Sequence, residues 1–584
     1  MEYNWELLPQ STDTTDFGED LFPQIRTILH NRNITSKEKL QTLKKPDFRK
    51  THNPFLMKDM KSAVERLGEA VSKRQKILVY GDYDVDGTTA IALVYSFLRD
   101  RQANVDYYVP NRYTEGYGVS KVGIQWAIEN SFQLIITLDC GIKANDTIKM
   151  ANDASIDVIV CDHHNAGDEL PPAFAILDPK RPDCNYPFKE LSGCGVGFKL
   201  LEAYCITYNL PLKSNLYCYR DYVAISIAAD IVPIVDENHN LMYYGLKKME
   251  QKPLPSIQTM LINCGLISLS YDENGFEKLI VKNDELTVSS IVFKIAPKIN
   301  AAGRMNDARD AIRLLLAENE QDALQYLVTI DQHNTNRKEK EQIICKEALE
   351  IIEKDDDYQN KSTNVLYKAD WHKGVVGIAA AKIIESYYKP TIVLCGNGEI
   401  ISGSARSVEG FDLYSAINSC SDLLTAFGGH THAAGLSMMK KDLNEFCRRF
   451  DSYVAEHILD NQKQPTILID SEMTLADINS EFYEQVHYLA PFGPQNMDPV
   501  FIIKNIPIES HSYMGGDKSH LRLHFKNQSN SICAVGFFMA TLWEEKNMHD
   551  GDTVDICFTL SKNVFRDTIS YQLMLKDFRK SYLL

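Results

Sequence analysis

The chain has 584 residues, of which 44% are hydrophobic and 24% are charged, and its formal net charge is -17. One hydrophobic core does not extend over such a length, which predicts roughly three or four domains. No apolar run reaches the roughly 20 residues of a membrane span, so no membrane association is expected. The acidic N-terminus lacks the basic start and apolar stretch of a secretory signal.

The 13 cysteines include no CxxC pair. This pattern disfavours a disulfide framework or a zinc ribbon and favours a reducing, cytoplasmic location. The negative net charge argues against a general electrostatic coat for nucleic acid, although it leaves room for a local basic channel.

Residues 1–54 form a predicted leader segment with two short helices. From residue 55 to about 265, strands alternate with helices. The predicted strands are 77–80, 105–109, 134–138 and 156–160, and the predicted helices are 57–74, 88–101, 122–130, 144–152, 198–208 and 217–229. This alternation predicts a parallel, doubly wound sheet whose functional side chains lie at the carboxyl ends of the strands.

The interdomain region, residues 266–360, ends in a mostly helical stretch at 312–359, predicted to connect two α/β lobes. The second lobe, residues 361–461, has predicted strands at 363–367 and 390–395 around a helix at 375–388. A linker at 461–465 follows. Residues 466–584 hold short strands, beginning with TILIDSEM (466–473), and this pattern is typical of a small β-barrel.

Acidic side chains follow several of the predicted strands in the first lobe. GDYDVDG (81–87) comes after the first strand, DCG (139–141) after the third, and DHH (162–164) after the fourth. A further carboxylate lies in the otherwise apolar segment 224–235, where an unpaired charge would be costly. The candidate residues are Asp82, Asp84, Asp86, Asp139, Asp162, His163, His164 and Asp230.

Taken singly, these residues have simpler explanations as turn residues, helix caps or polar surface groups. Several carboxylates at one sheet edge would repel each other, however, and divalent cations resolve that repulsion. Carboxylates with one or two imidazoles suit Mn²⁺ or Mg²⁺ better than zinc. Two ions about 3.5–4 Å apart would make a centre for the hydrolysis of phosphoester or phosphoanhydride bonds.

The motifs resemble those of the DHH phosphoesterases, and among them the RecJ exonucleases, which act on single strands. The matching segments follow the same order over most of the chain. They are VYGDYDVDGTT, TLDCG, VCDHH, residues 176–200, AADIVPIVDEN, FKIAPKINAAGRMNDA, WHKGVVGIAAAKIIE, GSARS, FGGHTHAAGLS and PFGPQNMDPVF.

The resemblance implies catalytic roles and two divalent ions, Mn²⁺ or Mg²⁺. The implied metal ligands are Asp84, Asp86, Asp139, His163 and Asp230, with Asp82 in the same acidic motif and His164 at the metal edge or near the scissile phosphate. Smaller DHH phosphodiesterases and family II pyrophosphatases carry a histidine four positions before the Asp-x-Asp. This chain has Tyr80 there, which argues against those subfamilies.

The second lobe resembles the DHH-associated domain, and the last domain resembles an oligonucleotide-binding (OB) barrel. The fold class expected is thus two α/β lobes joined by a long helix, plus an OB-like barrel. Gly403, Ser404 and Arg406 would form a phosphate cradle of backbone N–H groups and a guanidinium. The predicted nucleic-acid contacts are Arg304, Arg337, His372, Ser404, Arg406 and His430, and a solvated helix explains Arg337 almost as well.

The barrel would hold the strand through a basic groove and aromatic stacking. Its candidates are His511, Tyr513, Lys518, His520, Arg522 and His524, although barrel surface residues are often plain solvated groups.

The resemblance implies a 5′→3′ exonuclease that degrades single-stranded DNA to mononucleotides in recombination and repair. A single-strand-binding protein and a RecQ-type helicase are the implied partners, and the chain is expected to be a monomer. Two alternatives stay open: a phosphodiesterase for short oligonucleotides or cyclic dinucleotides, and an inactive scaffold like the eukaryotic replication-helicase cofactor of this fold.

Overall fold

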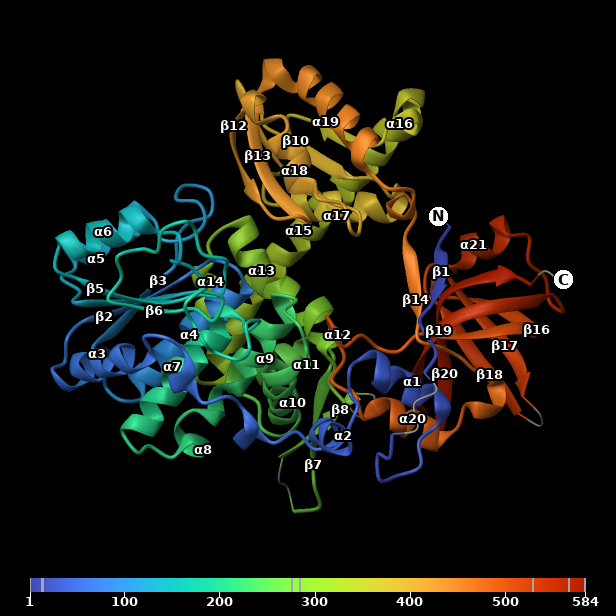
Figure 1. Cartoon of the computed structure of the whole chain (residues 1–584), viewed down its shortest axis with the longest axis horizontal. Helices are drawn as coiled ribbons and strands as arrows, with labels where there is room; N and C mark the ends of the chain where they lie inside the picture. The colour runs from blue at the N-terminus through green and yellow to red at the C-terminus, as the bar shows by residue number, and fades with distance from the viewer. Residues whose placement is uncertain are drawn as a thin grey trace. The chain divides into compact units, whose positions relative to one another are not determined.

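The computed structural model describes residues 2–11, 15–274, 277–282, 285–527, 530–565 and 568–581. The chain divides into two compact units (Figure 1). One contains Leu8–Asp331 and Asp470–Leu584, and the other contains Met1–Leu7 and Gln332–Ile469. Within the described residues, no helix combines the length and apolarity that crossing a bilayer requires.

The larger unit is built on a parallel sheet of five strands in the order β3-β2-β4-β5-β6. The strands are β2 (Ile77–Gly81), β3 (Val105–Tyr108), β4 (Leu134–Leu138), β5 (Asp157–Cys161) and β6 (Ala175–Leu177). β2, β4 and β5 read as runs of Val, Ile and Leu because a parallel sheet is buried on both faces. The four predicted strands are confirmed. β6 was missed, since three residues carry too little periodic signal.

Helices cover both faces of this sheet (Figure 1). α5 (Lys121–Glu129) and α6 (Asn145–Asp153) pack on the face that includes Leu78 and Tyr80. α3 (Met60–Ser72), α4 (Val85–Arg99) and α7 (Gly193–Thr207) pack on the face that includes Ile77 and Val79. Neighbouring residues of a strand therefore enter different cores, as the two-residue period of a strand dictates.

Two helices begin earlier than predicted, and both corrections concern the candidate site. α4 begins at Val85 rather than residue 88, because the Asp84 carboxylate caps it by accepting from the Gly87 amide at 3.0 Å. α7 begins at Gly193 rather than residue 198, and Ser192 caps it through the Gly195 amide. Glycines at helix starts weaken the periodic signal, so the prediction placed both starts too late.

The rest of the first lobe is helical, and its elements extend the same core. They are α8 (Leu212–Asn215), α9 (Arg220–Ala229), α10 (Asp236–Gln251), α11 (Pro255–Asn263), the hairpin β7 (Ile267–Tyr271) and β8 (Glu277–Val281), α12 (Val288–Ser290), a π-helix (Ile291–Ile295), α13 (Ala296–Met305) and α14 (Arg309–Leu315). In the N-terminal leader, α1 (Pro23–Asn31) and α2 (Lys37–Lys44) confirm the two predicted helices. Their apolar residues join the core of the C-terminal barrel.

The C-terminal strands form a closed barrel. The order is β15-β16-β17-β18-β20-β19, and an additional β16–β19 pairing closes the ring. The elements are β15 (Ser471–Glu472), β16 (Phe501–Met514), β17 (His520–Asn527), β18 (Asn530–Gly536), β19 (Thr553–Phe565) and β20 (Thr568–Lys580), with α20 (Ser480–His487) and α21 (Ala540–Glu545) between strands. The predicted barrel is confirmed.

One predicted barrel strand belongs elsewhere. β14 (Thr466–Ile469), the first part of TILIDSEM, pairs in parallel with β1 (Asn4–Leu7) and forms a separate two-stranded sheet. The register joins Trp5 to Ile467 across more than 460 positions of sequence. Local pattern cannot reveal such a partner, because a parallel pairing at this distance has no turn to mark it.

The smaller unit is a mixed sheet in the order β12-β13-β11-β10-β9 with helices packed on it. Its elements are β9 (Asn364–Tyr367), β10 (Thr391–Cys395), β11 (Ile400–Arg406), β12 (Leu424–Gly429), β13 (Ala433–Met439), α16 (Asp356–Asn360), α17 (Val376–Ser386), α18 (Leu413–Asn418) and α19 (Leu443–His457). The predicted strands and helix of this lobe are confirmed. The predicted long helix is α15 (Glu320–Lys354), and the boundary between the units falls within it.

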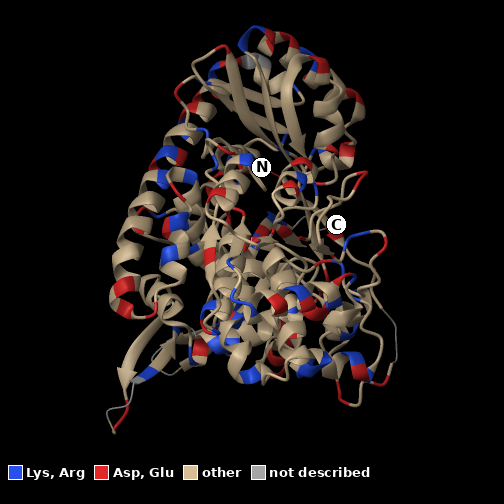
Figure 2. Cartoon of the chain, turned by 90° about the vertical axis from the view of Figure 1, so that its left-hand side faces the viewer, with Lys and Arg blue, Asp and Glu red and all other residues tan. Residues whose placement is uncertain are grey.

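Acidic and basic residues are interspersed along the helices in Figure 2, and neither sign dominates that view. In that view the acidic residues are not gathered into one block.

Candidate metal centre

The acidic residues of the first lobe gather at the carboxyl edge of the parallel sheet. β2 lies between β3 and β4, so the order of strands reverses at β2, and this reversal is where doubly wound sheets bind ligands. Asp82 follows β2, Asp139 follows β4, and His163 follows β5, and all three side chains are buried. Asp86, in the first turn of α4, and Asp230, at the end of α9, complete what we call the acidic cluster.

His163 lies at the centre of the cluster. Its Nε2 is 3.1 Å from Asp139 Oδ1, 3.6 Å from Asp230 Oδ2 and 3.8 Å from Asp86 Oδ2. The ligand atoms of Asp86, His163 and Asp230 all lie within 4.8 Å of one another, and those of Asp139, His163 and His164 do so too. The two groups share His163, so both belong to the same neighbourhood at the sheet edge.

Backbone and hydroxyl donors hold the Asp86 carboxylate in place. Asp86 accepts from the Gly193 amide at 2.6 Å, the Cys194 amide at 2.7 Å and the Ser226 hydroxyl at 2.7 Å. The two amides belong to the first turn of α7, whose dipole favours a negative charge there. Burial and the nearby Asp84 charge nevertheless raise the pKa of Asp86 to about 6.

The other carboxylates show the same electrostatic conflict. Burial, followed by repulsion from neighbouring carboxylates, raises the pKa of Asp82, Asp139 and Asp230 well above the ordinary value. Asp82 Oδ2 is buried without a hydrogen-bond partner among the described residues. Asp230 caps the C-terminus of α9, where the helix dipole disfavours an anion. Bound cations resolve all three costs, so the residues present fit divalent metal ions.

The sequence prediction placed Asp230 inside an apolar helix. In the structure it lies at the end of that helix, and its side chain is 27% exposed. Asp84 caps α4 and is in neither compact group, although its charge acts on the neighbouring carboxylates. Its assignment as a direct ligand is therefore less well supported than that of Asp86, Asp139, His163 or Asp230.

Asp162, a candidate residue to which the sequence assigned no role, orients the second histidine. Its carboxylate lies 2.7 Å from His164 Nδ1 and accepts from the Ile142 amide at 2.9 Å. Burial opposes its charge, but His164 lowers the pKa of Asp162 to about 2. Asp162, in turn, raises the pKa of His164 to about 9 against the effect of burial. The Asp162 carboxylate therefore favours the protonated form of the His164 imidazole.

Sequence reasoning also missed Tyr117 and Asp178. The Tyr117 hydroxyl lies 3.1 Å from His164 Nε2 and 3.2 Å from the Asp139 carbonyl oxygen. Asp178 follows β6 at the same sheet edge and is fully buried, and burial raises its pKa to about 7. The glycines on both sides of Tyr117 were an available signal. Asp178 gave none, because β6 itself was not predicted.

Of the predicted nucleic-acid contacts, Arg304 belongs to the larger unit and lies in the last turn of α13. The Arg304 carbonyl oxygen accepts a hydrogen bond from Tyr113. The positive charge of the Arg304 guanidinium acts on the pKa of Tyr83, the residue beside Asp82. A second cation that sequence reasoning missed, Arg112, lies over the Tyr83 ring at 5.2 Å from its centroid.

The other predicted contacts belong to the smaller unit. Ser404 and Arg406 lie on β11, and an Arg406 nitrogen donates to Ser404 Oγ at 2.8 Å. A Cβ at Gly377 would come within 2.9 Å of Ser404 Oγ, so α17 packs closely against this pair. His372 precedes α17, and His430 is exposed in the turn after β12. The structure brings Ser404 and Arg406 together.

Arg337 was predicted as a nucleic-acid contact, with a solvated charged helix as the alternative interpretation, and the structure shows that its side chain is not solvated. It is only 7% exposed, and its guanidinium contacts Glu341 at 2.5 Å and Asn334 at 3.1 Å. Glu341 also pairs with Lys382. Because Arg337 is buried and its guanidinium is hydrogen-bonded to Glu341 and Asn334 within this unit, it is better suited to orienting α15 than to holding a phosphate directly.

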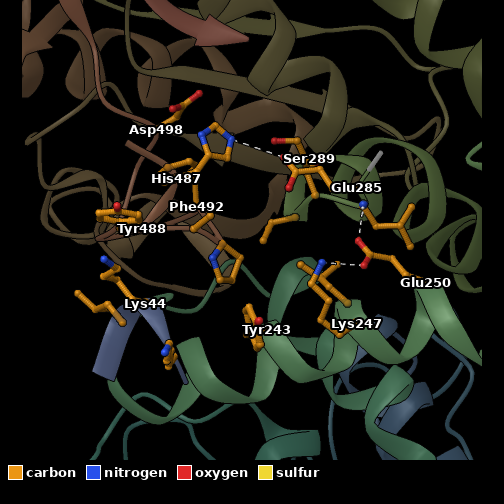
Figure 3. Close-up of a pocket in the computed structure, with 18 residues that line it drawn as sticks. Lys44, Tyr243, Lys247, Glu250, Glu285, Ser289, His487, Tyr488, Phe492 and Asp498 are labelled. Carbon is orange, nitrogen blue, oxygen red and sulfur yellow. Dashed lines mark hydrogen bonds and ion pairs between the residues drawn. The ribbon is translucent and has the colours of Figure 1, made fainter. Parts of the chain in front are cut away.

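The larger unit also contains a cavity of about 470 Å³ away from the acidic cluster (Figure 3). Two ion pairs lie in its lining: Lys247 is 2.8 Å from Glu250, and His487 is 3.6 Å from Glu285. Residues of the leader, of α10, of the segment 285–289 and of the segment before β16 line it. The lining combines acidic and basic side chains, in contrast to the unbalanced charge of the acidic cluster.

Three family descriptions match the chain in order. They are "DHH family, N-terminal domain" over residues 76–227, "DHHA1 domain" over residues 360–456 and "RecJ OB domain" over residues 469–577. The crystal structure of RecJ in complex with Mn²⁺ from Thermus thermophilus has a TM-score of 0.82 at 24% identity, covering 100% of this chain and 80% of that chain, and supports the fold. A structure of exonuclease RecJ bound to manganese has 29% identity and a TM-score of 0.57, covering 69% of this chain and 96% of that chain.

Two curated relatives are similar over nearly the whole chain. The single-stranded-DNA-specific exonuclease RecJ of Bacillus subtilis (strain 168) is 34% identical over 581 residues, which is 98% of this chain and 70% of the relative. RecJ of Escherichia coli (strain K12) is 30% identical over 587 residues, which is 97% of each. With these similarities added to the fold and to the acidic cluster, the chain belongs to the RecJ family of DHH phosphoesterases.

Proposed function

We propose that this protein is a metal-dependent exonuclease that hydrolyses single-stranded DNA from the 5′ end to 5′-mononucleotides. The observation that carries the proposal is the grouping of Asp86, Asp139 and Asp230 around His163 Nε2. Similarity to single-stranded-DNA-specific RecJ exonucleases supports the substrate class. The 5′→3′ polarity and the mononucleotide product rest on family membership alone.

The proposed ligands of the metal ions are Asp82, Asp84, Asp86, Asp139, His163 and Asp230. When bound, two Mn²⁺ or Mg²⁺ ions supply Lewis acidity toward a phosphoryl oxygen and acidify a water molecule. Asp86 keeps its orientation because three donors hold it, two of them at the start of α7. A second layer of hydrogen bonds of this kind orients ligands and tunes their basicity.

His164 has a separate proposed role. Asp162 holds it in its charged form, and its side chain remains 33% exposed at the edge of the cluster. A charged imidazole there can donate a hydrogen bond to a phosphate oxygen of the substrate. In the smaller unit, the adjacent Ser404 and Arg406, with His372 and His430, are the proposed contacts to the DNA backbone, and Arg304 and Arg337 remain weaker proposals.

Each proposed domain has a proposed role. Residues 55–265 would carry catalysis, residues 361–461 the DHH-associated contacts and residues 466–584 strand binding, with residues 1–54 as leader and 266–360 as connection. We also propose a monomer in the cytoplasm that works with a single-strand-binding protein and a RecQ-type helicase; the support for these last points is family membership alone.

The decisive experiment uses oligonucleotides labelled at the 5′ or the 3′ end, single- or double-stranded, with Mn²⁺ or with EDTA. We expect metal-dependent release of the 5′ label as mononucleotide from single strands only. Cleavage confined to very short oligonucleotides would support the small phosphodiesterase instead, and binding without cleavage would support the scaffold.

Two variants test the cluster itself. Asp139→Ala and His163→Ala should each abolish hydrolysis while the thermal melt stays cooperative, because each removes a proposed ligand. His549→Ala, at an exposed histidine of the barrel, is the matched control and should keep full activity. Undiminished turnover in Asp139→Ala or His163→Ala would disprove the role of that residue.

A further inference from the structure

Tyr80 is a buried residue at the end of β2 that contributes nothing to the acidic cluster. It is 0% exposed, and its ring stacks on Tyr108 with centroids 5.2 Å apart. Its hydroxyl donates to the Gly118 carbonyl at 3.1 Å and accepts from the Ser120 amide at 2.9 Å. Both hydrogen-bonding functions of the phenol are thus used by one segment, residues 111–120, which we call the tyrosine loop.

The tyrosine loop has a second anchor in Glu115. Its carboxylate accepts from the Asn111 amide at 2.8 Å, the Tyr108 hydroxyl at 2.9 Å and the Ser120 hydroxyl at 2.6 Å. These contacts tie the two ends of the loop to each other. The Gly118 amide reaches Asp82 Oδ1 at 3.3 Å, which ties the loop to the acidic cluster as well.

Between these anchors the loop presents Tyr117. Gly116 and Gly118 have φ values of +86° and +84°, which L-residues rarely adopt, so the turn on each side of Tyr117 depends on glycine. The Tyr117 ring is 57% exposed, yet its hydroxyl contacts His164 Nε2 and the Asp139 carbonyl oxygen. The Asp162 carboxylate lies 2.7 Å from His164 Nδ1, and the Tyr117 hydroxyl lies 3.1 Å from Nε2 and 3.5 Å from Nδ1, so both groups contact this imidazole.

We propose that Tyr80 is a positioning residue of this centre: through Gly118 and Ser120 it fixes the tyrosine loop, and so holds the Tyr117 hydroxyl against His164. The inference rests on the proposed function. Loss of the Tyr80 hydroxyl leaves the Gly118 carbonyl and the Ser120 amide without their buried partner. The loop then loosens, and the His164 side chain keeps only the hydrogen bond that it donates to Asp162. Asp86 keeps its own supports, since α7 and Ser226 hold it, and Asp82 loses at most the 3.3 Å hydrogen bond from the Gly118 amide.

The test compares Tyr80→Phe with Tyr222→Phe. Tyr222 is a matched control because it is 3% exposed and its hydroxyl donates to the Leu315 carbonyl at 2.6 Å, away from the tyrosine loop. Three quantities are measured on the full chain: amide hydrogen exchange of the peptide that covers residues 111–120, Mn²⁺ affinity by calorimetry, and kcat and KM on single-stranded DNA.

We expect Tyr80→Phe to speed exchange of the 111–120 peptide by about tenfold, in line with the loss of one or two buried hydrogen bonds. We expect kcat to fall by about tenfold, with smaller changes in KM and in Mn²⁺ affinity. Tyr117→Phe should lower kcat similarly without speeding exchange, because it removes the contact to His164 and leaves the anchors intact. Tyr222→Phe should alter none of these quantities beyond a small loss of stability.

Wild-type kcat and exchange in Tyr80→Phe would overturn the inference. An equal fall in kcat for Tyr222→Phe would also overturn it, since the effect would then be general destabilisation. A matching loss of Mn²⁺ affinity would show that Tyr80 acts on the metal ligands instead. If the wild-type chain cleaves no single-stranded DNA, the proposed function fails, and the exchange data still decide whether Tyr80 fixes the loop.

Discussion

The position of Asp139 depends on a glycine of another helix, and Gly193→Ala tests this dependence. Gly193 is the first residue of α7, and its amide donates to Asp86. A Cβ at residue 193 would lie 2.5 Å from Asp139 Cβ and 2.7 Å from Asp139 Cα. Carbon atoms in contact are normally about 3.5–4.0 Å apart, so the two segments must separate by about 1 Å.

That separation would displace two proposed metal ligands, Asp139 and Asp86. Asp139 is on one side of the new methyl group, and Asp86 is held by the amide on the other. A displacement of about 1 Å in a catalytic arrangement lowers turnover by about a hundredfold, and overpacking costs about 1–3 kcal/mol of stability. We therefore expect Gly193→Ala to lose about two orders of magnitude in kcat, with weaker Mn²⁺ binding and a lower melting temperature.

Gly197→Ala is the matched control on the same helix. Its Cβ would meet the Leu138 Cδ2 methyl at 3.1 Å and the Val94 Cγ2 methyl at 3.5 Å, and side-chain ends can adjust. Alanine also favours a helix interior over glycine by about 0.5–1 kcal/mol. Release of the 5′ label is followed for both variants well below their melting temperatures. Equal turnover in the two variants would refute the argument that Gly193 sets the position of Asp139.

Three further predictions concern other buried groups. Ser226→Ala removes a donor to Asp86, so Mn²⁺ affinity measured by calorimetry should fall by about 10–100-fold; unchanged affinity would contradict this role. Burial raises the pKa of Asp498 to about 6, so its contribution to stability falls as the pH rises from about 4 to 6. Asp498→Asn should therefore raise the melting temperature at pH 8 and have little effect at pH 4. An equal shift of the melting temperature at both pH values would contradict this assignment of the raised pKa to Asp498. Lys199 is buried, and its ammonium lies 2.8 Å from Glu237. Lys199→Met should lower the free energy of unfolding in urea by about 3–5 kcal/mol, because Glu237 would stay buried without a counter-ion. A loss below about 1 kcal/mol would contradict this prediction.

Much of the site could be predicted from the sequence because its residues follow strands with strong apolar patterns. The runs before Asp82, Asp139 and His163 are strands of Val, Ile and Leu, and parallel strands bring their carboxyl ends to one edge. Convergence of these side chains follows from the strand pattern alone. The closed C-terminal barrel was predictable for a similar reason, since its strands alternate and are separated by turns.

Contacts between distant segments were decided only by the tertiary structure. The sequence does not show that Gly193 and Ser226 donate hydrogen bonds to Asp86. It does not show that Asp162 raises the pKa of His164, or that Arg337 forms an ion pair with Glu341. Nor does it show that β1 pairs with β14. The physical reason is the separation in sequence between the interacting residues. Strand and helix patterns reflect neighbours within a few positions, whereas a buried hydrogen bond depends on which distant segments pack together. Tyr80 illustrates both cases. Its strand could be predicted from the sequence, but its hydrogen bonds to Gly118 and Ser120 could not.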